Sequence, residues 1–153
     1  MAFSVAVSVV KNEYAAADVV QESFVKAFEN LKSFKAKSKF STWFIRIVTN
    51  ESFKYVQKKK VHYTNSVIEL EDIQKDVLQD ADRRFFVNEV LKIMSPNESL
   101  ALRLFYLNEN SIKEICEITG WNKSKVKVTL HRARKSMEDK LSLLLKNEVD
   151  LLL

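Results

Sequence analysis

Residues 111–134 have the sequence SIKEICEITGWNKSKVKVTLHRAR, which predicts two helices joined by a tight turn. Ser111 with Glu114 three residues later forms a capping box, a signal that starts a helix. Gly120, the only glycine in the chain, stands where a residue in the left-handed conformation would end that helix. Asn122 or Lys123 then caps a longer helix. A short helix, a glycine-containing turn and a longer helix predict a helix-turn-helix.

The longer helix separates an apolar stripe from a basic face. At 100° per residue, one narrow stripe contains Val126, Leu130, Ala133, Met137, Leu141 and Leu144. The opposite side contains Lys125, Val128, His131, Arg132 and Lys135. Residues 121–135 hold six basic side chains and no acidic one, a pattern that favours DNA binding. A helical hairpin with a solvated basic face stays open as the alternative.

Helical signals also precede this motif. Ser95-Pro96-Asn97-Glu98 predicts another capped helix with proline in its first turn. Phe40, Trp43, Phe44, Ile47 and Val48 recur at helical spacing, with Ser41 as the expected N-cap. An earlier helical stripe contains Val20, Phe24, Ala27, Phe28 and Leu31. Residues 1–10 are apolar, and we interpret them as the tail of a core helix.

Composition narrows the fold to an all-α class. The 153 residues include one Gly and one Pro, too few for a glycine-rich phosphate loop or a hairpin-rich barrel. One Cys and two distant histidines, His62 and His131, give neither a disulfide nor a metal or catalytic cluster. We therefore expect no cofactor, no metal and no enzyme activity. No apolar run is long enough to span a membrane, and we expect a cytoplasmic chain.

The distribution of charge predicts two small helical domains and a linker. The chain carries a net charge of +5. Residues 1–60 carry +6, residues 61–95 carry −3, and residues 96–153 carry +2. We expect domains at 1–60 and 83–153, joined by an acidic linker at 61–82.

Three stretches together resemble the bacterial extracytoplasmic-function (ECF) sigma factors of the sigma-70 family. DVVQESF at 18–24 resembles the D-x-x-Q-E-x-F signature of region 2, and FSTWFIRIVTN at 40–50 resembles F-x-x-W-L-x-R-I-x-x-N. VKVTLHRAR at 126–134 resembles V-K-x-x-L-H-R-A-R of region 4. The chain departs from the family in a shortened start of region 2, in Ser124-Lys125 where Gly-Thr is common, and in a leucine-rich tail at 141–153.

The resemblance implies a factor that binds core RNA polymerase and promoter DNA. Residues expected to meet the clamp coiled coil of the polymerase are Asp18, Gln21, Glu22 and Glu29. Those expected at the minus-ten promoter element are Phe40, Trp43, Arg46, Asn50 and Lys54. The minus-thirty-five element would be read by Lys127, Val128, His131 and Arg132, with phosphate contacts from Lys123, Lys125 and Lys135. An anti-sigma factor is a further expected partner, and nucleoid association the expected location.

Simpler interpretations stay open at several of these positions. Asp18 and Glu22 suit the start of any helix, where acids stabilise the dipole. Phe40 and Trp43 lie on a helical stripe, where an aromatic residue is usually part of the core, so Asn50 and Lys54 are the stronger candidates for DNA contact. Four linker acids, Glu69, Glu71, Asp72 and Asp76, either mimic nucleic acid in the polymerase cleft or form a solvated linker. The alternative function is a stand-alone helix-turn-helix regulator, which would not need the 18–24 motif.

Overall fold

The structure is a computed structural model that describes residues 1–62 and 79–152, with side chains for 1–59 and 86–144. Over these residues the chain is helical and contains no strand, which confirms the all-α prediction. The elements in order are α1 (Ala2–Val10), α2 (Glu13–Glu29), the short 3-10 helix η1 (Leu31–Ser33), α3 (Phe40–His62), α4 (Gln79–Ile93), α5 (Pro96–Leu102), the π-helical η2 (Arg103–Leu107), α6 (Ile112–Thr119) and α7 (Lys123–Leu152).

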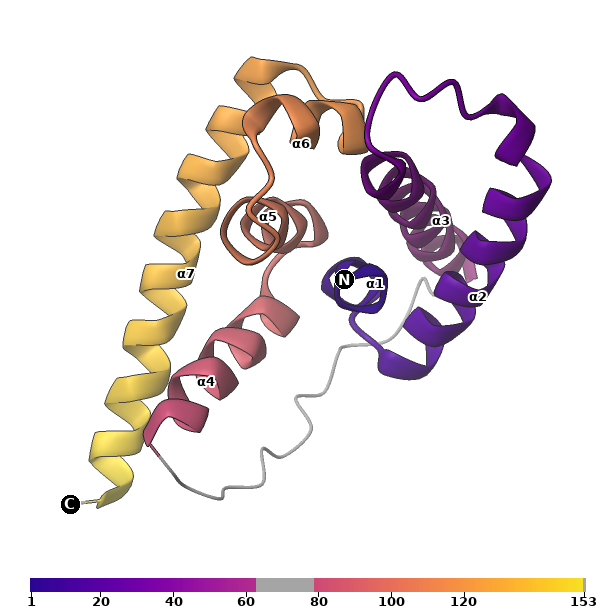
Figure 1. The fold of residues 1–153 in the computed structure, drawn as a ribbon. Coiled ribbons are helices and arrows are strands. Elements are labelled where there is room, and N and C mark those ends of the chain that lie inside the picture. Colours follow the sequence, from indigo (N-terminus) through magenta and orange to yellow (C-terminus); the bar gives the residue numbers. More distant parts are fainter. Residues whose placement is uncertain (63–78, 153) are drawn as a thin grey trace.

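The helices form two groups with α1 between them (Figure 1). Helices α2 and α3 lie on one side of α1, and α4 to α7 lie on the other. The long α7 runs along α4 and α5. We call α1–α3 the first module and α4–α7 the second module.

One hydrophobic core crosses from the first module into the second. Val5, Ala6 and Val9 of α1 are fully buried. They belong to the same cluster as Val48 of α3 and Leu100 of α5. A nine-residue helix is too short to be stable in isolation, so the position of α1 depends on packing against both modules.

A second cluster joins α4, α5 and α7, and it accounts for the apolar stripe predicted on the last helix. Its buried members are Val90, Leu91, Met94, Leu102 and Ala133, and Met137, Leu141 and Leu144 pack against it. Val126 and Leu130 lie in the first cluster. The predicted stripe is therefore confirmed as far as Leu144, so the described beginning of the leucine-rich tail packs on the second module.

The predicted apolar stripe of α2 is wrong at its aromatic positions. Phe28 is 81% exposed, and Phe24 and Leu31 are also exposed. The buried side of α2 consists instead of small residues: Ala15, Ala16, Val19, Ser23 and Ala27. Small side chains let two helices approach closely. The Phe28 ring is left exposed, and the Phe24 ring lies at the edge of the helix contact, with its centroid 4.6 Å from that of Phe44 on α3.

Helix starts agree with the sequence signals at most positions, with an error at Ser41 and an incomplete capping box at Ser95. The backbone N–H of Trp43 donates to the carbonyl of Lys39 (3.1 Å), so α3 begins at Phe40. Ser41 lies inside the first turn and is not the N-cap. Ser95 caps α5 as expected, but the Glu98 carboxylate accepts from the Ser95 hydroxyl (2.9 Å), so the reciprocal backbone bond of a full capping box is replaced.

The predicted linker at 61–82 overlaps both flanking helices. Residues 61–62 end α3, and residues 79–82 form the first turn of α4. The four acids proposed to mimic nucleic acid, Glu69, Glu71, Asp72 and Asp76, lie outside the described residues.

Candidate nucleic-acid and protein-binding surfaces

The helix-turn-helix forms where the sequence predicts it. Ser111 and Glu114 make the full capping box, with the Ser111 hydroxyl accepting from Glu114 N–H (3.2 Å) and the Glu114 carboxylate accepting from Ser111 N–H (2.9 Å). Gly120 ends α6 with φ of 72°. The Asn122 side chain accepts from Lys125 N–H (2.8 Å) and caps α7. Since Ile115, Ile118, Val126 and Leu130 are buried together, the two helices are held at a fixed angle.

The outer side of α7 is open to solvent at every position predicted to bind DNA. We call this set the recognition face: Lys123, Lys125, Lys127, Val128, His131, Arg132 and Lys135 are all exposed. Val128 is 49% exposed, enough for its methyl groups to reach a base. The ion pairs found among the described side chains use none of these cations. The face therefore presents unneutralised positive charge.

Two neighbours restrain the recognition face at its edges. The Lys125 ammonium lies 4.9 Å from the ring centroid of Trp121, a cation–π contact. Arg134 donates through Nε to the Leu130 carbonyl (3.3 Å) and through Nη1 to the Tyr106 hydroxyl (3.3 Å). The guanidinium of Arg134 therefore binds within the module, as its position at the side of the helix suggests.

The predicted minus-ten residues form one surface on α3, which we call the minus-ten face. Arg46, Asn50 and Lys54 are exposed, Trp43 is half-buried and Phe40 is half-exposed. Phe34, Phe40 and Trp43 pack as three rings with centroids 5.2–5.6 Å apart. The aromatic rings thus combine partial packing with partial exposure, and the minus-ten role of Phe40 and Trp43 stays a prediction.

Two polar contacts connect α3 and the residue before it with α6 of the second module. Arg46 Nη1 donates to the carbonyl of Glu117 at the end of α6 (3.1 Å). The Lys39 ammonium pairs with the Glu114 carboxylate (3.1 Å). Hydrogen bonds from Ser111 N–H and from Lys39 lower the pKa of Glu114. Among the described contacts of the predicted minus-ten residues, Arg46 therefore has a hydrogen-bond partner in the second module.

A third contact joins the two modules at the C-terminal end of α1. Lys11, the left-handed residue that ends α1, donates through Nζ to the carbonyl of Leu91 near the end of α4. Burial, together with repulsion from Arg103, lowers the pKa of Lys11 to about 7. Sequence patterns did not predict the three contacts between the modules, because their partners lie far apart in the sequence.

The residues predicted to bind polymerase share one exposed surface of α2, which we call the polymerase face. Asp18, Gln21, Glu22 and Glu29 are all exposed and fall within about 100° of the helix circumference. Sequence patterns missed three apolar side chains on this surface, Tyr14, Val25 and Phe28, which are also exposed. The small-residue stripe on the other side of α2 is the signal that could have identified them.

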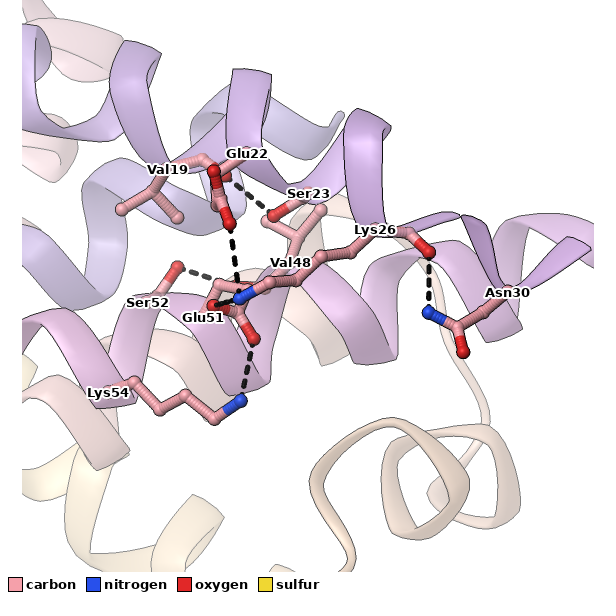
Figure 2. Close-up of polar contacts among 9 residues, drawn as sticks. All are labelled: Val19, Glu22, Ser23, Lys26, Asn30, Val48, Glu51, Ser52 and Lys54. Atoms are coloured by element: carbon pink, nitrogen blue, oxygen red, sulfur yellow. Dashed lines mark hydrogen bonds and ion pairs between the residues drawn. The ribbon is translucent and has the colours of Figure 1, made fainter. Parts of the chain in front are cut away.

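Charged side chains connect the polymerase face with the minus-ten face (Figure 2). The Lys26 ammonium contacts Glu51 of α3 and Glu22 of its own helix, the latter at 3.3 Å. The other Glu51 oxygen accepts from Lys54 (2.8 Å). Burial alone would raise the pKa of Glu51, but hydrogen bonds from Lys26 and Lys54 outweigh it and lower that pKa. The hydrogen bond to Glu51 raises the pKa of Lys26.

Among the described side chains, no group of three or more His, Cys, Asp or Glu residues is placed to hold a metal ion. Among the described helices, none is both long and apolar enough to cross a membrane.

Comparison with known proteins identifies relatives for both modules. Residues 1–62 match the family model for sigma-70 region 2, and residues 87–137 match that for sigma-70 region 4. The chain is 30% identical to the ECF RNA polymerase sigma factor SigW of Bacillus subtilis, over 85% of this chain and 77% of that protein. It is 32% identical to the RNA polymerase sigma factor YlaC of the same organism, over 83% and 78%.

Solved structures share the fold. The sigma factor RpoE in complex with the anti-sigma factor NepR from Bartonella quintana superposes with a TM-score of 0.69 at 22% identity, covering 92% of this chain and 89% of that one. CnrH in complex with the cytosolic domain of CnrY gives a TM-score of 0.62 at 22% identity, covering 95% and 80%.

Proposed function

The chain belongs to the ECF sigma factors of the sigma-70 family, which direct promoter-specific transcription initiation by core RNA polymerase, and we propose that its two modules divide that task between the surfaces described above. The family membership predicted from three short motifs is thereby confirmed, and the alternative of a stand-alone helix-turn-helix regulator is not favoured.

The recognition face of α7 is our candidate for reading the minus-thirty-five element. The observation that carries this assignment is a set of exposed cations on one side of the helix that follows the Gly120 turn, none of which forms an ion pair with a described side chain. An α-helix fits the major groove, where Arg or Lys pairs with guanine and an aliphatic side chain meets the thymine methyl. We assign Arg132, Lys127, His131 and Val128 to bases, and Lys123, Lys125 and Lys135 to phosphates.

The minus-ten face of α3 is our candidate for binding opened promoter DNA. Unpaired bases stack on aromatic rings along a basic surface. The Phe40–Trp43 pair near the start of α3, with Asn50 and Lys54 farther along the same side, offers both features. Arg46 would have to exchange the Glu117 carbonyl for a phosphate or a base.

The polymerase face of α2 is our candidate for the clamp coiled coil. Interfaces combine charged edges with exposed apolar anchors. Asp18, Gln21, Glu22 and Glu29 would supply the polar contacts, and Phe28 supplies an anchor that is 81% exposed.

The domain boundaries and the linker stay part of this proposal. We assign residues 1–60 to polymerase and minus-ten binding, 83–153 to minus-thirty-five binding, and 61–82 to an acidic linker whose carboxylates would occupy nucleic-acid space in the polymerase cleft. Replacing Glu69, Glu71, Asp72 and Asp76 with serine should then change the pattern of abortive transcripts, whereas an unchanged pattern would leave a solvated linker.

We also propose an anti-sigma factor as a regulatory partner, because one structural neighbour is a sigma factor in complex with an anti-sigma factor, and CnrH is likewise in complex with a domain of another protein, CnrY. The chain would act at the nucleoid in the cytoplasm, without catalysis or a cofactor of its own.

Run-off transcription with reconstituted holoenzyme tests the assignment of the recognition face. Arg132→Ala should reduce transcription from a specific promoter by about 5- to 150-fold, the effect of losing one good base contact. Lys140→Ala, which removes the same charge farther along α7, is the matched control and should change transcription little. Binding of core polymerase should be unaffected by either variant. Equal losses in the two variants would contradict the assignment, and loss of polymerase binding would indicate misfolding.

A further inference from the structure

Four side chains of alternating charge connect two surfaces to which we have given separate roles. Glu22 of the polymerase face pairs with Lys26, Lys26 pairs with Glu51, and Glu51 pairs with Lys54 of the minus-ten face (Figure 2). The chain of contacts crosses from α2 to α3. Its two inner members, Lys26 and Glu51, belong to neither surface as assigned above.

The inner pair is held in a well-packed setting. The Glu51 side chain is only 11% exposed, whereas that of Lys54 is 61% exposed. Next to it, the buried hydroxyls of Ser23 and Ser52 donate to carbonyls of their own helices, at Val19 (2.6 Å) and Val48 (2.7 Å). These small, internally satisfied side chains keep α2 and α3 close together. The Lys26–Glu51 contact is therefore a fixed link between the two helices.

Resting on the function proposed above, we propose that Lys26 and Glu51 are positioning residues that couple occupancy of the polymerase face to the freedom of Lys54 on the minus-ten face. Lys26 divides its attraction between Glu22 and Glu51, and Glu51 divides its attraction between Lys26 and Lys54. When polymerase engages Glu22, Lys26 turns fully to Glu51. Glu51 then holds Lys54 less strongly, and the Lys54 ammonium becomes available to a DNA phosphate.

The direction of the effect follows from the order of the charges. Removing the charge of Glu22 should release Lys54, whereas removing that of Lys26 should leave Glu51 to Lys54 alone and restrain it more. Each ion pair includes a lysine whose side chain is 33% or 61% exposed, so water screens the attraction and we expect changes of about 1.5- to fivefold. Two residues that act through a third give non-additive effects in a double-mutant cycle.

Residue-resolved acylation of lysine amines, read by mass spectrometry on the full chain, measures the freedom of Lys54. Glu22→Gln should raise the acylation rate of Lys54, and Lys26→Met should lower it. In the double variant the effect of Glu22→Gln should vanish, because the link is broken. Glu13→Gln removes the same charge from α2 about two and a half turns earlier and should leave the rate unchanged. Lys26→Gln provides the same cycle if Lys26→Met does not fold.

If Glu22→Gln still raises the acylation rate of Lys54 in the Lys26→Met and Lys26→Gln variants, the coupling is overturned. The change would then be a direct electrostatic effect of Glu22 on Lys54 that does not pass through Lys26. The absence of any effect of Glu22→Gln would overturn it as well.

A second measurement adds core polymerase without DNA. Polymerase should raise the acylation rate of Lys54 in the wild-type chain and not in Lys26→Gln. A rate that falls, stays constant or rises equally in both chains overturns the coupling. If the wild-type chain does not bind polymerase at all, the proposed function fails instead, and the cycle in the free chain still reports on the ion-pair link.

Discussion

Replacing Gly120 with alanine isolates the contribution of one backbone conformation to the helix-turn-helix. Gly120 has φ of 72°, and a Cβ added to it would meet no atom within 4 Å. Packing therefore adds no cost, and the substitution acts through the backbone alone. A left-handed L-residue costs about 1–2 kcal/mol. The lower entropy of the unfolded alanine chain offsets about 0.4–1 kcal/mol of that, which leaves a net destabilisation of about 1 kcal/mol.

Urea denaturation of the full chain, followed by circular dichroism and tryptophan fluorescence, measures this loss. Trp121 lies beside the substitution and Trp43 lies on α3, so the two rings report on different modules. A loss of about 1 kcal/mol corresponds to a Tm lower by about 2–4 °C for a chain of this size. Gly120→Asn is the matched control and should lose less, because asparagine tolerates the left-handed conformation. If alanine stabilises the protein, or if asparagine is as harmful as alanine, the conformational reasoning is refuted.

Two further predictions concern the polymerase face and the contact at Lys11. Phe28→Ser should leave the free energy of unfolding within about 0.5 kcal/mol of wild type, because the ring is exposed. The same variant should weaken core-polymerase binding by tenfold or more in a direct binding assay. Full retention of binding would exclude Phe28 from the interface. Burial lowers the pKa of Lys11 from 10.5 to about 7, so between these values the unfolded chain holds more protons and the free energy of unfolding should rise with pH. Relative to Lys11→Met, the wild type should gain at most about 1.4 kcal/mol per pH unit between pH 7 and 9 in urea titrations, and a pH-independent difference would contradict the buried-amine explanation.

Local signals explain why the helix-turn-helix could be predicted from the sequence. The capping box at Ser111, the left-handed Gly120 and the Asn122 cap all act within a few residues of where they occur. The recognition face could also be predicted, because helical periodicity places apolar and basic residues on opposite sides of α7. Val126 is buried and Arg132 is exposed, as that periodicity predicts.

The orientation of α2 could not be predicted in the same way. Apolar spacing pointed to Phe24 and Phe28 as core residues, but the packed side is the one lined by Ala16, Ser23 and Ala27. Hydrophobic periodicity assumes that the largest apolar residues are buried. That assumption fails where helices pack closely through small residues and an aromatic stays exposed.

Contacts between segments far apart in the chain also could not be predicted from the sequence. The pairs Lys26–Glu51, Lys39–Glu114 and Lys11–Leu91 join residues 25, 75 and 80 positions apart. Each depends on the angle between two helices, which no local pattern encodes. Charge along the chain predicted two modules, but a core shared by both requires knowledge of which apolar surfaces meet.

The short first helix has a consequence for any attempt to divide this protein. Val5 and Val9 pack in the same cluster as Leu100 and Leu104 of the C-terminal half. A polypeptide carrying only the C-terminal half would therefore expose this hydrophobic surface to water and tend to self-associate. Supplied as two separate chains cut between residues 62 and 79, the halves should instead find each other and rebuild the native assembly, with the N-terminal helix as the shared binding element.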